Sequence, residues 1–478
     1  MEKLTYETLL TSLEFEHSFG SLFLEYHTVV VDRKSINNFV LSKGYYYEYN
    51  CFNTLWVEIS KTQLNNRITQ WLHSQWLILN REMTDTAKAL ILTKAVTKCC
   101  KYKHIENVVL SITSDILDDS IFDKLDKAKP ELLPIKDNRV INLFTKEVRS
   151  RVISDYFTFE CPVEPVTEYS DFFTSMIESI MCGNKENLDY FQRIMGYCLT
   201  GSKEAQSYFI WYGKGSNGKS LILNLLQSVL GKAASPISKS VMVDMGKKGS
   251  NGCEMITLKD LRLGTFSETN SNDALNEGIL KTISGGDRIR ARALYKEEIS
   301  FELFVKLIVC TNHKPEFNGA DHGTTRRIKL LPFDAKFVSK DPNPAKREYQ
   351  IIEDLENTLI KNHLDEFFTF CLEGAVKWCN DKKFDNVPQV VKEQQDEYIR
   401  EQNSFGCWFK EYIRPNDGYR LNRPEAYKSY ACICDERGLK PLSKKDFFNK
   451  LGEECGKAYK YQGNFVYMGF TLLEDDSD

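Results

Sequence analysis

The 478-residue chain lacks the features that define several classes of protein. No apolar run approaches the ~18–20 residues needed to cross a bilayer, and the N-terminus lacks the basic and then apolar pattern of a secretory signal. Gly and Pro together number only 39, too few for a collagenous or low-complexity chain. We therefore expect a soluble, intracellular protein with no membrane partner, folded into roughly three units at ~100–200 residues per domain.

Metal-binding cysteine patterns are also missing, although fourteen cysteines are present. The closest pairs are Cys99-Cys100 and Cys432-x-Cys434, no CxxC pair exists, and no His pair has zinc-finger spacing. We interpret the cysteines as buried, reduced thiols. An excess of one charge is absent as well, because 63 Lys and Arg face 67 Asp and Glu, a net charge of −4. Any nucleic-acid site must therefore be a local basic patch.

A phosphate-binding loop lies near the middle of the chain. Residues 207–212 form an apolar strand, and residues 213–220 read GKGSNGKS, which matches G-x-x-x-x-G-K-[ST] at every required position. An apolar helix follows and ends at Gly231. A chance glycine-rich loop would lack this strand and helix, so the sequence predicts ATP and Mg²⁺ as cofactors. The expected nucleotide-binding residues are Gly213, Gly215, Ser216, Asn217, Gly218, Lys219, Ser220 and Leu221.

Within this loop, Lys219 is expected to reach the β- and γ-phosphates and the Ser220 hydroxyl to ligate Mg²⁺. Downstream, Glu268 follows a second apolar segment, where a carboxylate can polarise the attacking water and help hold Mg²⁺. Asn312 follows a third apolar segment, where its amide can lie between the γ-phosphate and the water. Taken alone, Glu268 would be an ordinary loop carboxylate and Asn312 a turn residue.

A loop with a pair of arginines, Arg326 and Arg327, comes next. Such a pair is suited to stabilise transition-state charge in a neighbouring subunit. The order and spacing of these motifs resemble superfamily 3 helicases of the AAA+ class, specifically those in primase–helicases of poxviruses, other large DNA viruses, phages and plasmids. The resemblance is carried by residues 212–220 (YGKGSNGKS), 266–269 (FSET), 280–292 (LKTISGGDRIRAR), 310–315 (CTNHKP) and 326–333 (RRIKLLPF), and it extends upstream over roughly residues 80–170.

The resemblance implies a role for each motif residue. Lys219 and Ser220 would be the Walker A pair, Glu268 the Walker B acid, Asn312 the sensor and Arg327 the arginine finger. Many relatives carry an acidic pair at the Walker B tip, whereas this chain has a serine before Glu268. Because of this departure, the sequence leaves open how Ser220, Glu268 and water share the binding of Mg²⁺.

The family also implies an ATP-dependent replicative helicase, a homo-hexameric ring that translocates on single-stranded DNA and unwinds forked duplexes. We expect it in the cytoplasm, and in the host cytoplasm if its source is a virus or phage. No acidic DxD pair or zinc-ligand set precedes the ATPase segment. The sequence therefore predicts a helicase without a primase domain, with a separate primase or polymerase as a candidate partner, although the chain can also be one fragment of a split system.

A local basic patch lies between residues 281 and 296, with five basic residues and one acidic residue. The alternating pattern over residues 290–304 predicts a hairpin with Tyr295 and Lys296 near its tip. By resemblance this hairpin would project into the ring channel, where Lys296 contacts phosphate and Tyr295 stacks on sugar or base. A merely solvated charged hairpin is the alternative.

The last ~75 residues predict a separate unit of helix, helix and hairpin, which is a winged-helix pattern. The second helix follows a capping box at Ser443 and is expected to end at Gly452. This unit would either face a DNA duplex or dock a protein. The expected DNA-contacting residues of the chain are Lys281, Arg292, Tyr295, Lys296, Lys444 and Lys445.

The predicted fold class is α/β, with an AAA+ P-loop core whose central parallel sheet is flanked by helices, an N-terminal helical domain and a C-terminal winged-helix domain. A P-loop kinase or packaging motor would use Lys219 and Glu268 without needing the basic hairpin or Arg327. An AAA+ initiator that melts an origin would keep every motif. The predicted domains are 1–80 (small α/β region), 81–170 (helical pre-helicase domain), 171–340 (ATPase core), 341–395 (helical linker or lid) and 396–478 (winged-helix-like domain).

Overall fold

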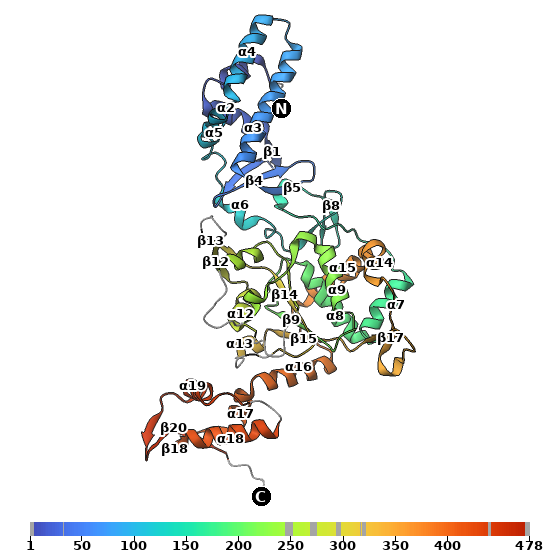
Figure 1. The fold of residues 1–478 in the computed structure, drawn as a ribbon, viewed down its shortest axis with the longest axis vertical. Coiled ribbons are helices and arrows are strands. Elements are labelled where there is room, and N and C mark those ends of the chain that lie inside the picture. Colours follow the sequence, from blue (N-terminus) through green and yellow to red (C-terminus); the bar gives the residue numbers. More distant parts are fainter. Residues whose placement is uncertain are drawn as a thin grey trace.

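The computed structural model describes residues 4–31, 33–243, 252–267, 275–292, 298–315, 317, 322–437 and 441–473. The molecule is elongated, and its regions follow one another in chain order (Figure 1). The N-terminal region forms one end, the region around β9 and β14 the middle, and a small C-terminal unit the other end. Among the described residues, no helix is both long and apolar enough to cross a membrane.

The N-terminal region packs helices against two small antiparallel sheets, one of β1 and β2 and one of β3, β4 and β5. Most of its core is a cluster of buried residues between Leu4 and Ile116, whereas Tyr47 and Trp56 of the β3–β5 sheet belong to the cluster that continues into the middle region. Helix α3 crosses residue 80, where we predicted a domain boundary, so this core includes residues from both sides of it. The elements are α1 (Tyr6–Ser12), α2 (Glu16–Tyr26), β1 (Thr28–Val31), β2 (Lys34–Asn37), β3 (Phe39–Ser42), β4 (Tyr45–Asn50), β5 (Leu55–Ile59), α3 (Lys61–Glu82), α4 (Thr86–Cys99) and α5 (Tyr102–Ser111).

A short helix and an antiparallel sheet connect this region to the middle of the molecule. Residues 81–170, which we expected to be helical, therefore also contain three strands. Asp137 and Asn138 have φ values of +63° and +58° and form the tight turn between the first two strands. The elements are α6 (Asp119–Lys124), β6 (Leu132–Ile135), β7 (Arg139–Asn142) and β8 (Val148–Ser150).

The middle of the molecule contains a five-stranded parallel sheet in the order β10-β11-β14-β9-β15. Successive residues of β9 alternate between two buried clusters, since Phe209 and Trp211 belong to one and Tyr208 and Ile210 to the other. Both faces are therefore covered, as parallel sheets require. This confirms the predicted α/β class with a central parallel sheet. The strands are β9 (Tyr208–Tyr212), β10 (Ala234–Pro236), β11 (Leu263–Ser267), β14 (Lys306–Thr311) and β15 (Ile328–Pro332).

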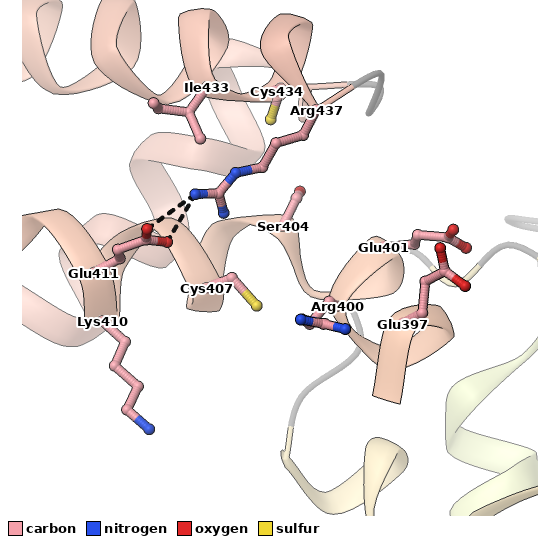
Figure 2. A pocket seen from close by; sticks show the side chains of 10 residues that line it. All are labelled: Glu397, Arg400, Glu401, Ser404, Cys407, Lys410, Glu411, Ile433, Cys434 and Arg437. Carbon is pink, nitrogen blue, oxygen red and sulfur yellow. Dashed lines mark hydrogen bonds and ion pairs between the residues drawn. The ribbon is translucent and has the colours of Figure 1, made fainter. Parts of the chain in front are cut away.

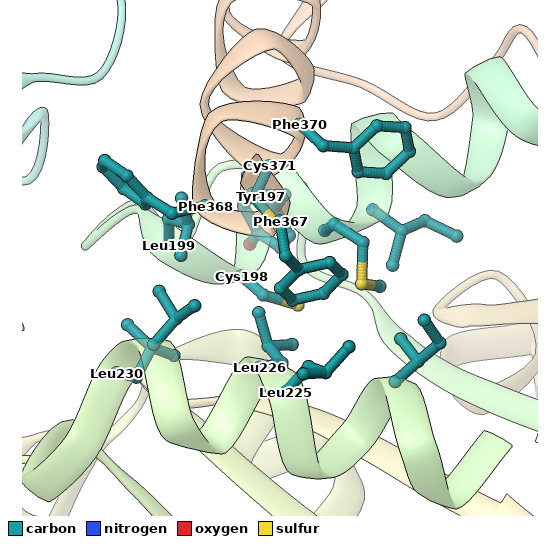
Figure 3. Close-up of a cluster of buried hydrophobic side chains, with 14 of the residues drawn as sticks. Tyr197, Cys198, Leu199, Leu225, Leu226, Leu230, Phe367, Phe368, Phe370 and Cys371 are labelled. Atoms are coloured by element: carbon teal, nitrogen blue, oxygen red, sulfur yellow. The ribbon is translucent and has the colours of Figure 1, made fainter. Parts of the chain in front are cut away.

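One face of the sheet is covered by long helices whose apolar side chains interlock, as Figure 3 shows for Leu226, Cys198 and Phe367. Shorter helices and the β12–β13 hairpin contribute to the cluster on the other face. The helices of the middle region are α7 (Asp171–Ile180), α8 (Lys185–Leu199), α9 (Lys219–Leu230), α10 (Lys239–Met242), α11 (Gly252–Met255), α12 (Glu277–Gly285), α13 (His322–Thr325), α14 (Leu355–Asn362), α15 (Leu364–Asp381) and α16 (Gln389–Gln402).

Two further strand pairs lie outside the sheet. The predicted hairpin is present as β12 (Arg288–Arg292) and β13 (Glu298–Glu302), which pair in antiparallel register, while its tip lies outside the described residues. The strands β16 (Lys336–Val338) and β17 (Glu348–Gln350) form a short parallel pair.

The C-terminal unit has three helices and a three-stranded antiparallel sheet in the order β18-β20-β19. We expected a helix ending at Gly452, which is wrong, because α19 continues to Cys455 and ends before Gly456, whose φ is +80°. A glycine inside a helix costs only about 1 kcal/mol relative to alanine. The residues of the neighbouring turns offset this cost, so the helix continues past Gly452. The elements are α17 (Ser404–Tyr412), β18 (Ile413–Asn422), α18 (Arg423–Glu436), α19 (Lys444–Cys455), β19 (Tyr459–Tyr461) and β20 (Asn464–Leu472).

The closest helix contact in the middle region joins α8 and α15. A Cβ atom built on Gly196 would lie 1.9 Å from the backbone nitrogen of Ala375, and one built on Gly374 would lie 1.8 Å from the carbonyl oxygen of Gln192. No side-chain rotation relieves a clash with backbone atoms, so each helix requires a glycine at this crossing.

We expect Gly196→Ala to destabilise the protein by at least the ~1–3 kcal/mol typical of overpacking, because the two helices must separate to admit one methyl group. Urea unfolding followed by circular dichroism measures this change. Gly452→Ala is the matched control, since its new Cβ would lie 3.7 Å from Tyr467 Oη, an ordinary contact, inside α19. The control should be neutral or stabilising by about 0.5–1 kcal/mol, and equal midpoints for Gly196→Ala and the wild type would contradict the prediction.

Candidate nucleotide-binding site

The predicted phosphate-binding loop joins the end of β9 to the start of α9 at the carboxyl edge of the parallel sheet. Gly215 and Gly218 have φ values of +95° and +88°, which side chains rarely allow. A Cβ atom on Gly213 would lie 2.5 Å from the carbonyl oxygen of Phe333. The glycines therefore let the loop curl tightly against the sheet, at the N-terminus of a twelve-residue helix.

The amino group of Lys219 lies at the centre of the loop. It donates hydrogen bonds to the Gly213 carbonyl oxygen (2.6 Å), Asn217 Oδ1 (3.1 Å) and Asn312 Oδ1 (3.2 Å). The side chain is largely buried, and this burial lowers the pKa of Lys219 from its usual value. A buried cation held by three oxygen atoms at a helix N-terminus is suited to receive an anionic ligand.

Asn217 and Ser216 anchor the loop to the segment after β15. The Asn217 amide donates to the Phe333 carbonyl oxygen at 3.1 Å, and the residue is only 3% exposed. Ser216 Oγ donates to the Phe337 carbonyl oxygen at 2.8 Å, and the Phe337 N–H donates back to the Ser216 carbonyl oxygen at 2.7 Å. The loop is therefore held by the chain that follows a different strand of the sheet.

The remaining nucleotide-site candidates lie at the same sheet edge where the structure describes them. Ser220 is exposed in the first turn of α9, and Leu221 follows it. Asn312 directly follows β14 and contacts Lys219, as the sequence order predicted. Glu268 directly follows the last residue of β11 in sequence but lies outside the described residues. Among the described residues, no group of three or more His, Cys, Asp or Glu side chains is placed to hold a metal ion.

The paired arginines lie at the opposite edge of the sheet. Arg327 precedes β15, and its carbonyl oxygen accepts from the N–H of Tyr208 at the start of β9 (3.0 Å). The length of β9, roughly 13 Å at ~3.3 Å per residue, separates this edge from the phosphate-binding loop. Arg327 Nη1 donates to the Gly323 carbonyl oxygen at 2.6 Å, and exposed Arg326 donates to Gln206 Oε1 at 3.3 Å. Neither arginine reaches the loop of its own chain.

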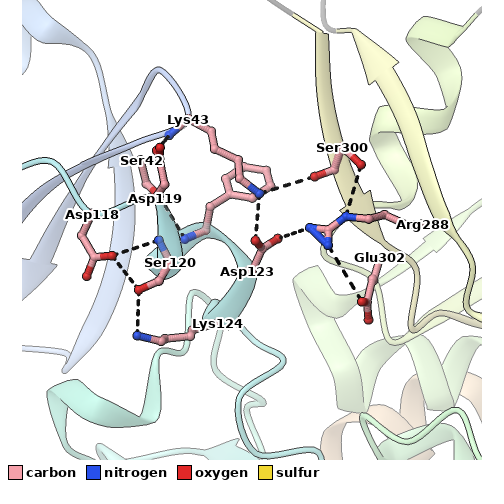
Figure 4. A network of polar contacts seen from close by, with 11 residues as sticks. Ser42, Lys43, Asp118, Asp119, Ser120, Asp123, Lys124, Arg288, Ser300 and Glu302 are labelled. Carbon is pink, nitrogen blue, oxygen red and sulfur yellow. Dashed lines mark hydrogen bonds and ion pairs between the residues drawn. The ribbon is translucent and has the colours of Figure 1, made fainter.

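The base of the β12–β13 hairpin is joined to the N-terminal region by ion pairs (Figure 4). Asp123 of α6 accepts from Lys43 Nζ at 2.9 Å and from Arg288 Nη2 at 3.0 Å. Arg288 Nε also donates to Ser300 Oγ across the hairpin at 3.2 Å. Burial alone would raise the pKa of Asp123, but hydrogen bonds from Lys43 and then Arg288 outweigh it and hold the pKa below its ordinary value.

The predicted DNA-contacting residues are distributed over three places. Lys281 lies on α12 and Arg292 at the end of β12, whereas Tyr295 and Lys296 lie outside the described residues. Lys444 and Lys445 are exposed in the first turn of α19, in the C-terminal unit.

Two cavities were not anticipated from the sequence. One of about 710 Å³ lies between α16, α17 and α18, where Figure 2 shows Arg437 paired with Glu411. Its charged side chains of both signs offer no phosphate cradle. The other, of about 390 Å³, directly adjoins the phosphate-binding loop. Its lining comes from helices and strands far apart in sequence and comprises Met176, Ile180, Ser216, Gly218, Leu221, Phe337, Ile351, Ile352, Asp354, Leu355 and Glu356.

Comparisons with known proteins point to large DNA viruses. A family model described as "Family of unknown function (DUF5906)" matches residues 211–327. The chain is 34% identical over 156 residues to "Putative helicase L207/L206" of Acanthamoeba polyphaga mimivirus, covering 32% of this chain and 16% of that protein. It is 27% identical over 275 residues to "Putative helicase 022R" of Frog virus 3, covering 56% and 28%.

A further relative is "Primase D5" of Fowlpox virus, 26% identical over 312 residues, which cover 61% of this chain and 39% of that protein. The chain thus spans less than two fifths of the length of these three relatives. The apo C-terminal region of NrS-1 is similar with a TM-score of 0.47 at 12% identity, over 94% of this chain and 98% of that chain. The similarity to proteins named helicase and primase in large DNA viruses, which the motifs predicted, is confirmed.

We expect Asn217→Ala to loosen the phosphate-binding loop, because it removes one acceptor of Lys219 and the donor to the Phe333 carbonyl oxygen. Leaving buried polar groups unpaired costs about 1–3 kcal/mol, so the amides of residues 213–219 should exchange hydrogen roughly tenfold faster or more. Hydrogen–deuterium exchange with mass spectrometry measures this. Lys214→Ala, an exposed position of the same loop, is the control and should leave exchange unchanged. Equal exchange in both variants would show that Asn217 does not anchor the loop.

Proposed function

We propose that the chain is the ATPase part of a superfamily 3 DNA helicase of the AAA+ class that acts in DNA replication. The observation that carries the proposal is the convergence of Lys219 and Asn312 at 3.2 Å at the carboxyl edge of the sheet. A lysine that reaches phosphates and a polar side chain beside the γ-phosphate are the two groups that an NTPase needs at this edge. The resemblance to viral proteins named helicase supports the same conclusion.

ATP would lie with its phosphates along the loop from Gly213 to Ser220 and its base in the adjoining cavity of about 390 Å³. The loop amides and the α9 N-terminus suit a triphosphate, and the aliphatic lining from Ile351, Ile352 and Leu355 suits a purine ring. Ser220 and Glu268 would hold Mg²⁺, which supplies charge neutralisation between the β- and γ-phosphates when bound. Lys219 would exchange its present oxygen partners for phosphate oxygens.

The position of Arg327 supports a ring. Because Arg327 and the phosphate-binding loop lie at opposite edges of one sheet, an Arg327 finger must act on the nucleotide of a neighbouring subunit, with Arg326 as the second candidate. Repetition of this head-to-tail contact closes into a ring, which we propose is a homo-hexamer. DNA in the channel would contact Lys281, Arg292, Tyr295 and Lys296, and Lys444 and Lys445 of a winged-helix-like C-terminal unit would contact duplex DNA. A separate primase or polymerase would complete the replication machinery.

Lys219→Ala should reduce ATP hydrolysis by orders of magnitude, because it removes the cation that faces the β- and γ-phosphates. The measurement is phosphate release at saturating ATP and Mg²⁺, with folding checked by thermal unfolding. Lys232→Ala, an exposed lysine just beyond the other end of α9, is the control and should hydrolyse ATP at the wild-type rate. Undiminished turnover in a folded Lys219→Ala variant would refute the assignment. Forked-duplex unwinding with and without ATP then separates a helicase from an initiator or a packaging motor.

Arg327→Ala should bind ATP almost normally and hydrolyse it ~10³–10⁵ times more slowly, as expected for loss of an arginine finger. Mixing Arg327→Ala with Lys219→Ala subunits tests whether the finger acts in trans. The mixture should regain some activity, because an intact loop in one variant can face an intact Arg327 in the other. Mixed rings without any rescue would show that Arg327 does not act across the interface.

A further inference from the structure

The sheet of the C-terminal unit has an outer face that the three helices do not cover. Leu421 pairs with Tyr467, and both are buried in the core of the unit. Their strand neighbours Arg420 and Met468, which also pair, must therefore point to the opposite side of the sheet. Val466 lies two residues before Met468, is buried, and is absent from the core cluster, which places it on this same outer side.

Register extends the outer face to the edge strand. Tyr459 pairs with Val466, so Tyr459 and, two residues later, Tyr461 share the outer face with Met468. Their exposed fractions are 56% for Tyr459, 42% for Tyr461 and 46% for Met468. We call these three residues and Arg420 the outer sheet face. It presents two tyrosine rings, a methionine and an arginine to solvent.

A cation already lies on one of these rings. The guanidinium of Arg420 stands 4.1 Å from the centre of the Tyr461 ring, a cation–π contact that joins the two side chains. Lys457 is exposed and lies two residues before Tyr459, whereas Lys460 pairs with Phe465 and points to the other side of the sheet. Residues 404–478 carry twelve basic and twelve acidic side chains and so no net charge, which makes the positive charge beside these rings a local feature of Arg420 and Lys457. The outer sheet face therefore combines aromatic rings with two local cations, the arrangement that attracts a polyanion with stackable bases.

We propose that the outer sheet face binds single-stranded nucleic acid, with bases stacked on Tyr459 and Tyr461 and phosphates paired with Arg420 and Lys457. Side chains two residues apart on a strand stand ~6.6 Å apart, about twice the 3.4 Å rise of stacked bases. Each ring thus has room for its own base. Aromatic rings take any base, so the face should bind without strong sequence preference.

This site is distinct from the other proposed nucleic-acid contacts. Lys444 and Lys445 lie on α19, which packs through Phe447 and Leu451 into the core on the inner side of the sheet. The β12–β13 hairpin belongs to the middle region of the molecule (Figure 1). Binding at the outer sheet face requires neither ATP nor a ring, and so does not depend on the proposed ATPase activity.

The test uses the full chain without nucleotide and labelled 20-residue oligothymidine, followed by fluorescence anisotropy. The paired variant Tyr459→Ala with Tyr461→Ala should weaken binding at least about fivefold per ring, the loss expected from removing a stacked base. The paired Tyr→Phe variant should bind like the wild type, because stacking needs the ring and not the hydroxyl, and it also excludes misfolding as the cause. Tyr102→Ala is the matched control, since Tyr102 is 63% exposed on α5 in the N-terminal region.

A second measurement locates the contact directly. Ultraviolet cross-linking of 5-bromouracil oligonucleotides should attach to peptides that contain Tyr459 or Tyr461, and oligouridine in parallel shows whether DNA or RNA is preferred. Unchanged affinity in the paired alanine variant, or cross-links confined to other segments, would overturn the proposal. So would a loss of self-association with DNA affinity intact, which would make the face a subunit contact. Wild-type protein that cross-links here but hydrolyses no ATP would contradict the proposed helicase and leave this site standing.

Discussion

The buried ammonium group of Lys219 is the constraint on which the centre of this structure depends. A cation withdrawn from water needs oxygen partners, and hydrogen bonds to charged groups contribute about 1.5–3 kcal/mol each. Its three partners come from the end of β9, from the loop itself and from the residue after β14. Satisfying one amino group therefore fixes the ends of two strands and the path of the loop between β9 and α9. Asn217 extends the same network to the chain after β15.

Two other buried cations tie the opposite edge of the sheet to its surroundings. Arg262 is fully buried and donates to the carbonyl oxygens of Leu199 (2.6 Å) and Leu132 (2.8 Å), while Lys306 donates to the carbonyl oxygens of Thr200 and Phe304. Burial lowers the pKa of Arg262 to about 10 and that of Lys306 well below its usual value. Hydrogen bonds to two backbone carbonyl oxygens offset part of the cost of burying each cation. The sheet is thus fixed at both edges by cations, one available to a ligand and two enclosed.

Local patterns predicted the parts of the fold that depend on neighbours in sequence. The strand before the glycine-rich loop, helix α9 and the C-terminal hairpin follow from periodicity and turn chemistry, and the structure has all three. Pairing between strands that are distant in the sequence could not be predicted, because it leaves no pattern in the local sequence. Strand β18, with its Pro and Asp-Gly, is a poor strand by composition and forms only because β20 pairs with it.

The candidate site was likewise predicted only in the parts that depend on local sequence. The order of Lys219 and Asn312 in the sequence was enough to place both at one edge of a parallel sheet, because parallel strands all end there. The apolar cavity beside the loop was missed, since Phe337, Ile352 and Leu355 are ordinary apolar residues until α7, α9 and the chain after β15 meet around them. The identity of an apolar residue in the sequence does not show whether it will lie in the core or line a pocket.

The contact between α6 and the β12–β13 hairpin combines exposed ion pairs with a buried apolar part. Asp123 is shared between Lys43 and Arg288, all three side chains are partly exposed, and such pairs contribute only about 0–1 kcal/mol each. The hairpin also buries Ile299 and Phe301 in the same apolar cluster as Phe122 of α6, and separating apolar surfaces exposes area at ~25 cal/mol per Å². The apolar cluster therefore contributes most of the stability of this junction, while the ion pairs of Asp123 fix where the hairpin base lies relative to α6.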